Sequence, residues 1–363
     1  MPAAVRALAA IAFSLTVSLT ALSAAPHWKI QYIYDRADSN FNIEDLECST
    51  TEHCVAAGVI DDKKGHLHGS VVVTSDGGRH WSQYELKEEP ISIFFLNDDL
   101  GWMVTEHGLW STVEGGRAWT RVESRKGILQ SWFLNANHGY IVGLQGLVQE
   151  TTDGGKTWMT LEVSEQQPNR KSINYDLISF AGAHGFIIGA ADSPSPFLVN
   201  PRSPLPAGGK VTVLETLDSG KSWKYGVIPL EGELARLKLS RKGFVVSLIL
   251  YSDPKLPLAS AVFKTPLGSP DGSMIFGERD RFATDIALLN NGGGVLVAIE
   301  PPGNSPRIPI PGKLKILKSD NLAEWNEMDV DYRAVAQSAV IAAPDDRHMW
   351  VATDTGEILT LLE

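Results

Sequence analysis

The sequence has few cysteines, no surplus of positive charge and no long stretch with helical periodicity after its first residues. The two cysteines among 363 residues allow at most one intramolecular disulfide. The formal net charge of −11 argues against general nucleic-acid binding, which needs a basic face to meet phosphates. No P-loop, dinucleotide fingerprint, HExxH or GxSxG motif occurs. We therefore expect no cofactor, no metal and no nucleic-acid partner.

The one long apolar run lies at the N-terminus. It follows a single positive charge, Arg6, and ends in the small residues Ala21, Ser23, Ala24 and Ala25. This layout is typical of a secretory signal peptide. The alternative is a membrane anchor, but residues 7–22 are short for a span and contain several serines and threonines. We expect a signal peptide over 1–25, a domain over 26–363, a secreted or periplasmic location, and no stable membrane span after signal removal.

The two cysteines, Cys48 and Cys54, are close together in LECSTTEHCVAAG. In an exported protein such a pair favours a disulfide, and the five residues between them fit a turn joining two strands. The alternative is half of a metal site with His53 as a third ligand. A second candidate for metal binding is the pair His66 and His68, for which a solvated loop is the favoured interpretation.

The strongest signal is an internal repeat in a chain rich in glycine (33 residues), proline (20) and tryptophan (10). Five octapeptides align: TSDGGRHW (74–81), TVEGGRAW (112–119), TTDGGKTW (151–158), TLDSGKSW (216–223) and KSDNLAEW (318–325). A weaker sixth copy is SPDGSMIF (269–276). The first three begin at residues 74, 112 and 151, which is about the length of one four-stranded propeller blade.

Each octapeptide has the chemistry of a tight hairpin turn. A short acidic side chain can accept hydrogen bonds from backbone N–H groups just after it, and glycine permits positive φ. The final aromatic residue starts the next strand and covers the hairpin. The acidic positions are Asp76, Glu114, Asp153, Asp218, Asp271 and Asp320; the aromatic positions are Trp81, Trp119, Trp158, Trp223, Phe276 and Trp325. Because Glu114 is longer than aspartate, its turn should be less well capped.

The residues around each octapeptide complete a blade. Residues 128–163 divide into three strands, the octapeptide turn and a fourth strand, WMTLEV; the same frame fits 43–86, 91–123, 173–228, 234–277 and 282–330. The last unit, 335–363, has only three strands, and residues 27–35 match the missing fourth, with Trp28 at the repeat's aromatic position. We therefore predict an all-β, seven-bladed propeller of four-stranded antiparallel blades, whose last blade is closed by the N-terminal strand.

These octapeptides resemble the Asp-box, or bacterial neuraminidase (BNR) repeat, [ST]-x-D-x-G-x-x-W. The blade pattern over 101–119 and 139–158 resembles the propellers typified by photosystem II assembly and stability factors. That resemblance implies a non-catalytic assembly platform that offers basic residues to a partner. The sialidases are a more distant resemblance: residues 307–309 read Arg-Ile-Pro, but without the preceding phenylalanine and far from the N-terminus. The alternative function is therefore a sialidase-like or other glycoside hydrolase, or a glycan-binding propeller.

In a propeller, the A–B and C–D turns lie on one face, and the B–C turns and D–A links on the other. Pro-rich insertions occur at the B–C positions of blades four to six (191–210, 251–260 and 300–313). The links and insertions carry the cations Arg125, Lys126, Arg170, Lys171, Arg202, Arg279, Arg281, Arg307 and Arg333, whereas the first link has Glu88 and Glu89. We predict that these cations bind a carboxylate, phosphate or acidic peptide of an envelope or secreted protein.

Overall fold

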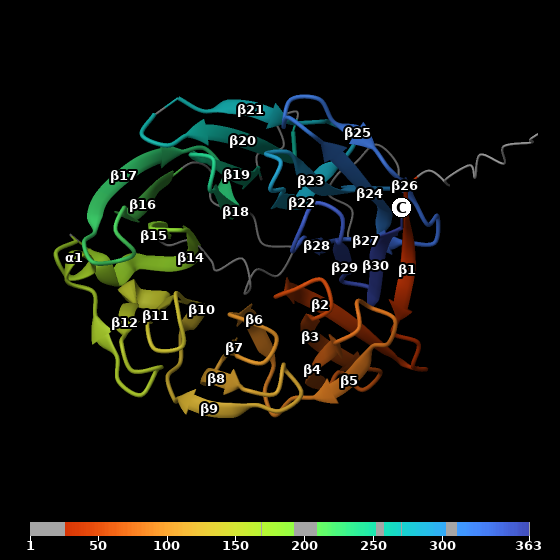
Figure 1. The fold of residues 1–363 in the computed structure, drawn as a ribbon, viewed down its shortest axis with the longest axis horizontal. Helices are drawn as coiled ribbons and strands as arrows, with labels where there is room; N and C mark the ends of the chain where they lie inside the picture. The colour runs from red at the N-terminus through yellow and green to blue at the C-terminus, as the bar shows by residue number, and fades with distance from the viewer. Residues whose placement is uncertain are drawn as a thin grey trace, which may run out of the picture.

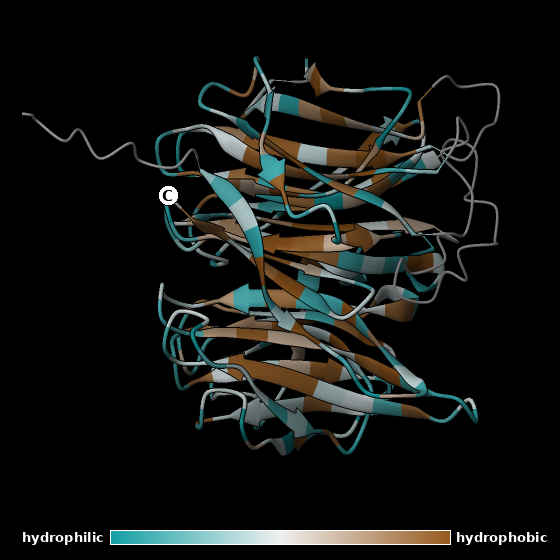
Figure 2. Ribbon diagram, turned by 90° about the vertical axis from the view of Figure 1, so that its right-hand side faces the viewer, coloured by the Kyte–Doolittle hydropathy of each residue, from teal (hydrophilic) through white to brown (hydrophobic). Residues whose placement is uncertain are grey.

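The computed structural model describes residues 26–167, 169–191, 209–251, 258–269, 271–302 and 311–362. They form seven sheets around a common centre, which is the predicted seven-bladed propeller (Figure 1). The first strand of each blade lies nearest the centre and the last lies at the rim, and we letter them A to D. Hydrophobic residues run along the interior of the strands, and hydrophilic residues gather in the turns at both faces (Figure 2).

The first three blades are regular. Blade 1 comprises β2 (Ser39–Cys48), β3 (Cys54–Asp62), β4 (Leu67–Thr74) and β5 (Ser82–Glu85). Blade 2 comprises β6 (Pro90–Phe95), β7 (Gly101–Thr105), β8 (Gly108–Thr112) and β9 (Thr120–Glu123). Blade 3 comprises β10 (Ile128–Phe133), β11 (Gly139–Gly143), β12 (Val148–Thr151) and β13 (Met159–Thr160), with a 3-10 turn at Leu144–Gly146.

The fourth strand of blade 3 is shorter than predicted. WMTLEV was expected to form one strand, but β13 pairs only at Met159 and Thr160, and the short helix α1 (Glu162–Glu165) follows. Leu161 is buried between them, and the Ser164 hydroxyl donates to the Leu161 carbonyl at 2.7 Å. Burial of Leu161 therefore turns the chain inward and ends the strand.

Blades 4 to 6 follow the same order of strands. Blade 4 comprises β14 (Ile173–Ala181), β15 (His184–Ala191), β16 (Gly209–Thr216) and β17 (Lys224–Leu230), preceded by a 3-10 turn at Arg170–Ser172. Blade 5 comprises β18 (Glu233–Ser240), β19 (Phe244–Leu250), β20 (Ser260–Pro266) and β21 (Ser273–Phe276). Blade 6 comprises β22 (Phe282–Leu288), β23 (Gly294–Glu300), β24 (Gly312–Ser319) and β25 (Asn326–Glu327), and β27 (Val335–Ala336) also pairs with β24.

The two ends of the chain meet in blade 7, as predicted. Its A, B and C strands are β28 (Ala339–Ala342), β29 (Trp350–Thr353) and β30 (Glu357–Leu362), and its D strand is the N-terminal β1 (His27–Ile33). β1 runs antiparallel to β30, with Trp28 opposite Leu361. A fifth strand, β26 (Asp329–Val330), pairs in parallel with the outer edge of β1. Because β26 covers this edge, the closing strand is held from both sides.

Aromatic side chains at the end of the repeat fill the spaces between blades. Trp119 packs with residues of blades 1 and 2, and Trp158 with residues of blades 2 and 3. Trp28, which is fully buried, takes the same place between blades 6 and 7. The space between blades 4 and 5 has no such tryptophan, because Phe276 packs toward blade 6, edge-to-face with Trp325. The aromatic residue of the sixth repeat therefore packs on the opposite side of its blade from those of blades 2 and 3.

The Asp-box turns use a threonine hydroxyl as their centre. In blade 3 the Thr151 Oγ1 accepts from the Gly155 N–H at 2.9 Å, and the Asp153 carboxylate accepts from the Thr157 N–H and hydroxyl. These bonds lower the pKa of Asp153 to about 2, because they favour the charged carboxylate. In blade 2 the Thr112 hydroxyl makes the same bonds, but no bond from the Glu114 carboxylate appears in the described part of the chain. This difference agrees with the expectation that the second turn is less well capped.

The turn of the fifth octapeptide lies where it was predicted, but the prediction of its capping residue is wrong by one position. Asp320 was predicted to be the capping acid, yet the side chain that accepts from the N–H groups of Ala323 and Glu324 is Asn321, at 2.8 and 3.0 Å. The hydroxyl partner is Ser319. The segment from the hydroxyl residue to the final tryptophan is one residue shorter here than in the other copies. The hydroxyl and the acceptor therefore each lie one position closer to the tryptophan.

A glycine in the turn lets the neighbouring blade approach. Gly220 has φ of +86°, and a Cβ there would collide with the Tyr140 hydroxyl of blade 3. Gly78 meets Gln31 of blade 7 in the same way. The Asp-box glycines therefore serve contact between blades as well as the turn itself.

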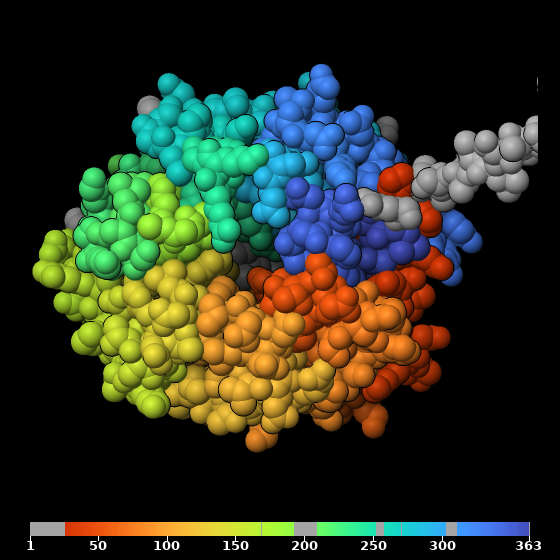
Figure 3. Space-filling model, in the orientation of Figure 1, coloured from red at the N-terminus to blue at the C-terminus, as the bar shows by residue number. Residues whose placement is uncertain are grey.

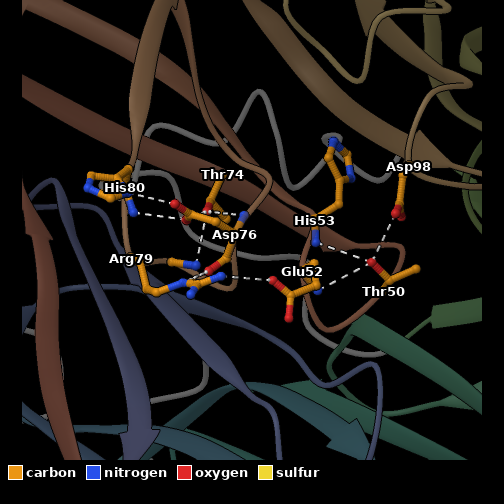
Figure 4. A network of polar contacts seen from close by, with 9 residues as sticks. Thr50, Glu52, His53, Thr74, Asp76, Arg79, His80 and Asp98 are labelled. Atoms are coloured by element: carbon orange, nitrogen blue, oxygen red, sulfur yellow. Dashed lines mark hydrogen bonds and ion pairs between the residues drawn. The ribbon is translucent and has the colours of Figure 1, made fainter.

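Cys48 and Cys54 form the predicted disulfide at the base of the first A–B loop. The loop docks on neighbouring turns (Figure 4). The Gly77 N–H donates to the Glu52 carbonyl at 2.9 Å within blade 1. His53 Nε2 donates to the Gly115 carbonyl of blade 2 at 3.1 Å, and Thr50 Oγ1 donates to Asp98 at 3.2 Å. The disulfide therefore fixes a loop that joins two blades, and the alternative of a half metal site is wrong.

The capping difference predicts opposite effects of two matched substitutions. Glu114→Asp should raise the melting temperature by about 1–2 °C, because the shorter carboxylate reaches the N–H groups of its turn. Asp153→Glu should lower it by about the same amount. Differential scanning calorimetry of both variants tests this expectation. Shifts of the same sign in both would contradict it.

Candidate functional site

Two faces of the propeller are distinguished by their hydrogen bonds. The A–B turns bond to the Asp-box turns, as in the bond from Gly154 N–H to the Asn137 carbonyl at 2.9 Å; we call this the Asp-box face. The D–A links pack on the B–C turns: the Thr355 hydroxyl donates to the Val335 carbonyl at 2.6 Å. We call this second surface the link face. The predicted binding residues lie in its links and insertions.

Four of the nine predicted cations of the link face are held in ion pairs within the protein. These pairs are Lys126 with Glu106 (3.4 Å), Arg170 with Glu165 (3.3 Å), Arg281 with Glu278 (2.9 Å) and Glu327 (2.8 Å), and Arg333 with Asp331 (2.6 Å). Within the described ranges, Arg125, Lys171 and Arg279 form no ion pair. Arg202 and Arg307 lie outside the described residues, as do most of the three Pro-rich insertions.

The pair between Arg333 and Asp331 shows how strongly such a cation can be held. The guanidinium donates to both oxygens of the carboxylate, at 3.0 and 2.6 Å. The side-chain hydrogen bonds and charge of Arg333 lower the pKa of Asp331 to about 2. A bidentate pair leaves the arginine few donors for a partner. The predicted basic ring is therefore interrupted, and three unpaired cations remain as its candidate contacts.

The A strands carry a second set of polar residues, which the sequence analysis missed. At a bulge in the strand, a side chain accepts a backbone N–H of the next blade: Asp45 from Ile93 (2.8 Å), Gln130 from Ile178 (2.8 Å) and Asp285 from Ile341 (3.0 Å). These bonds link the blades near the central hollow, which is visible in the space-filling view (Figure 3). Their signal in the sequence is only a polar residue at the same offset within these three A strands.

Charged side chains of different blades act on one another across the centre. Arg236 of blade 5 lies 3.4 Å from Asp285 of blade 6, measured from Nε to Oδ1. Burial first, and then the charge of Asp45, raise the pKa of Glu47 in blade 1 to about 8, and the charge of Lys238 of blade 5 opposes the rise. The channel wall is thus a mixture of carboxylates and cations.

Two pairs of carboxylates occupy equivalent positions in the channel wall. Asp176 of blade 4, which is 8% exposed, lies near Glu233 of blade 5, which is 7% exposed. Burial and then the charge of Glu233 raise the pKa of Asp176 to about 7; burial alone raises that of Glu233 to about 7. The second pair is Glu44 of blade 1 and Glu89, at the same strand positions of blades 1 and 2. Burial, and then the charges of Asp45 and Glu89, raise the pKa of Glu44 to about 7.

A tyrosine–glutamate contact exists, but its chemistry is not that of a nucleophile. The Tyr140 hydroxyl donates to Glu150 at 2.9 Å, and His138 lies 2.6 Å from the same oxygen. Burial first, and then the charge of Glu150, raise the pKa of Tyr140 well above its usual range. A phenol that attacks a substrate needs a lowered pKa. The contact lies within blade 3, and Tyr140 is fully buried beneath the Asp-box turn of blade 4, so its ring packs between the two blades.

His66 and His68 lie on an exposed hairpin. His66 Nδ1 is 3.1 Å from Asp62 Oδ2, and His68 Nε2 is 4.0 Å from the same oxygen. Across the described residues, no group of three His, Cys, Asp or Glu side chains is arranged to hold a metal ion. The same residues contain no helix that is long and apolar enough to cross a membrane.

The Asp176–Glu233 pair predicts a stability that falls as the pH rises. The folded-state pKa of about 7 exceeds the ordinary 3.8 of Asp176, so its contribution is fully present below about pH 4 and is lost as the pH rises through about 7. Glu233 acts in the same direction. Asp176→Asn should therefore raise the free energy of unfolding at pH 8 by on the order of 2–4 kcal/mol, with little effect at pH 4.

Urea unfolding of this variant between pH 4 and 8 provides the measurement. Asp320→Asn removes an exposed carboxylate and is the matched control, which should follow the wild-type profile. If the Asp176→Asn and wild-type profiles run parallel, the two carboxylates do not titrate as inferred.

Comparisons with known proteins agree with this architecture. The family described as photosynthesis system II assembly factor YCF48 matches residues 123–194. A structure titled "YCF48 bound to D1 peptide" has a TM-score of 0.60 at 15% identity, covering 92% of this chain and 100% of the other. YCF48 from Cyanidioschyzon merolae has a TM-score of 0.58 at 15% identity, covering 93% and 98%. The WD40 β-propeller domain of Doa1 has a TM-score of 0.56 at 11% identity, covering 93% and 97%.

No curated protein matches the sequence significantly. The structural likenesses establish the fold, and the family match is confined to blade 3, α1 and the first half of blade 4. Together with the repeated turns, they identify the chain as an Asp-box β-propeller that resembles the photosystem II assembly-factor propellers.

Proposed function

We propose that this chain is an exported, non-catalytic propeller that binds a protein partner through its link face. The observation that carries the proposal is Tyr332, on the link between blades 6 and 7. Its side chain is 90% exposed, more than any other large hydrophobic side chain among the described residues, and Val335 beside it is 36% exposed. Aromatic side chains of this kind are enriched at the centres of protein interfaces.

The unpaired cations of the same face support this proposal. Lys171 and Arg279 are exposed and Arg125 is partly exposed. A cation without an internal partner is available for a carboxylate or an acidic segment of another protein. Arg125 and Lys171 both lie within the stretch that matches the YCF48 family.

The comparisons support a protein partner in one further respect. The similar structure titled "YCF48 bound to D1 peptide" is a propeller of the same fold that holds a peptide. We extend peptide or protein binding to this chain, but not that partner.

The proposed location is the periplasm or the cell exterior. Residues 1–25 have the pattern of a signal peptide, and the chain contains a disulfide, a bond that persists in oxidising compartments. A partner is therefore expected among envelope or secreted proteins.

A triple charge-reversal variant of the link face tests whether this face binds the protein partner. Arg125→Glu, Lys171→Glu and Arg279→Glu together should abolish the capture of partners from an envelope extract, and Tyr332→Ala should reduce it. The matched control reverses Lys156, Lys221 and Arg241, which are exposed residues of the Asp-box face, and changes the net charge equally.

Affinity capture with quantitative mass spectrometry is the readout. Proteins retained by the wild type and the control, but lost from the link-face variant, are the expected result. Equal retention by all three would overturn the assignment of this face. Capture of glycans in place of proteins would favour the glycan-binding alternative.

A further inference from the structure

A hollow of about 530 Å³ opens on the link face between blades 1 and 2. One wall is the start of β4, from Leu67 to Gly69, and the other is the link 85–89. The Leu86 N–H donates to the Gly69 carbonyl at 2.8 Å, and a Cβ on Gly69 would collide with the Glu88 carbonyl. The close approach of the two backbone segments therefore sets the shape of the hollow, whose volume is in the range of ligand sites.

Glu88 lines the hollow, but its charge is used inside the protein. Its carboxylate accepts from the Thr105 hydroxyl at 2.5 Å and from Trp110 Nε1 at 3.2 Å. It also pairs with Arg121 of blade 2. This side chain anchors the link to blade 2 and is not available to a ligand.

The one lysine of this link is also directed toward blade 2. Lys87 Nζ lies 5.8 Å from the centre of the Trp110 ring, where a cation is attracted by the face of the ring. Glu85 and Glu89 are exposed, and neither forms an ion pair with any described residue. The hollow therefore contains two carboxylates that form no ion pair with a described residue, and His68 and Lys87 also line it.

A further carboxylate lies behind Glu89. The charge of Glu89 is one of the causes, after burial and Asp45, that raise the pKa of Glu44. The carboxylates of Glu44 and Glu89 therefore repel each other. A positively charged group placed there would relieve the repulsion.

We propose that this hollow binds a lysine or arginine side chain of the protein partner. The stem of the side chain packs on Leu67, which is 52% exposed, and on the half-buried Leu86. The charged head lies between Glu85 and Glu89. This inference rests on the proposed function and adds the chemistry of one contact. The next link carries Arg125, which forms no ion pair with a described residue, so the partner presents a basic group to one link and an acidic group to its neighbour.

The test uses three synthetic nonapeptides that differ only at the central residue: GSGARAGSG, GSGAQAGSG and GSGAEAGSG. Each is titrated into the isotope-labelled mature protein at low salt, and the amide resonances of residues 67–69 and 85–89 are followed. The arginine peptide should shift these resonances saturably, and the other two should not. Glu85→Gln with Glu89→Gln should weaken the arginine peptide by about fivefold or more, since each carboxylate contributes on the scale of an exposed ion pair.

The matched control is Glu106→Gln with Glu123→Gln, which removes two carboxylates from the same face of blade 2; Glu123 ends its D strand as Glu85 ends that of blade 1. The control should bind as the wild type does. Unchanged affinity in the Glu85/Glu89 variant, or equal binding of the glutamine peptide, would overturn the proposal. The titration is independent of partner capture. If the arginine peptide binds but no protein is captured through the link face, only the proposed partner-binding function is rejected. If a partner is captured and the Glu85/Glu89 change does not affect its binding, only the proposed role of the hollow is rejected.

Discussion

The contact between neighbouring blades is the constraint on which the rest of the structure depends. A twisted four-stranded sheet has two apolar faces and cannot bury either alone, so each blade must pack against two others. The Asp-box places a tryptophan at this interface while its threonine hydroxyl and glycine hold the turn. Trp28 performs the same packing where the chain ends meet, which explains why a strand from the opposite end of the sequence fits the last blade.

The inner ends of the blades are held differently. Close packing of the A strands leaves backbone N–H groups facing a neighbouring blade, and a buried N–H without an acceptor is costly. Asp45, Gln130 and Asp285 supply those acceptors. Burial raises the pKa of the acceptor Asp45, and also those of Glu44, Glu47 and Asp176, which belong to the same set of A strands. The same geometry that joins the blades thus makes the stability of the propeller sensitive to pH.

Features with a local and repeated pattern could be predicted from the sequence. The blade count, the closure by β1 and the Cys48–Cys54 disulfide all follow from spacing along the chain. The packing of Phe276 toward blade 6 could not, because it depends on contact with a neighbouring blade. The shift to Asn321 follows from the shorter spacing between Ser319 and Trp325, which an alignment on the tryptophans conceals. The ion pairs that occupy Arg281 and Arg333 were missed for a related reason: a charge run in a link does not reveal which carboxylates lie beside it.

The charged residues of the Asp-box turns recur from blade to blade, whereas those of the links between blades differ. Asp-box turns recur with similar residues because every blade needs the same contact. The links are not bound by that need, and they differ: the first carries Glu85 and Glu89, and the second carries Arg125, none of which forms an ion pair with a described residue. A surface with opposite charges on adjacent links fixes the orientation of a partner more strongly than a uniform ring, since a rotated partner would meet like charges. The departure from symmetry on this face therefore indicates recognition, whereas the symmetry of the other face indicates folding.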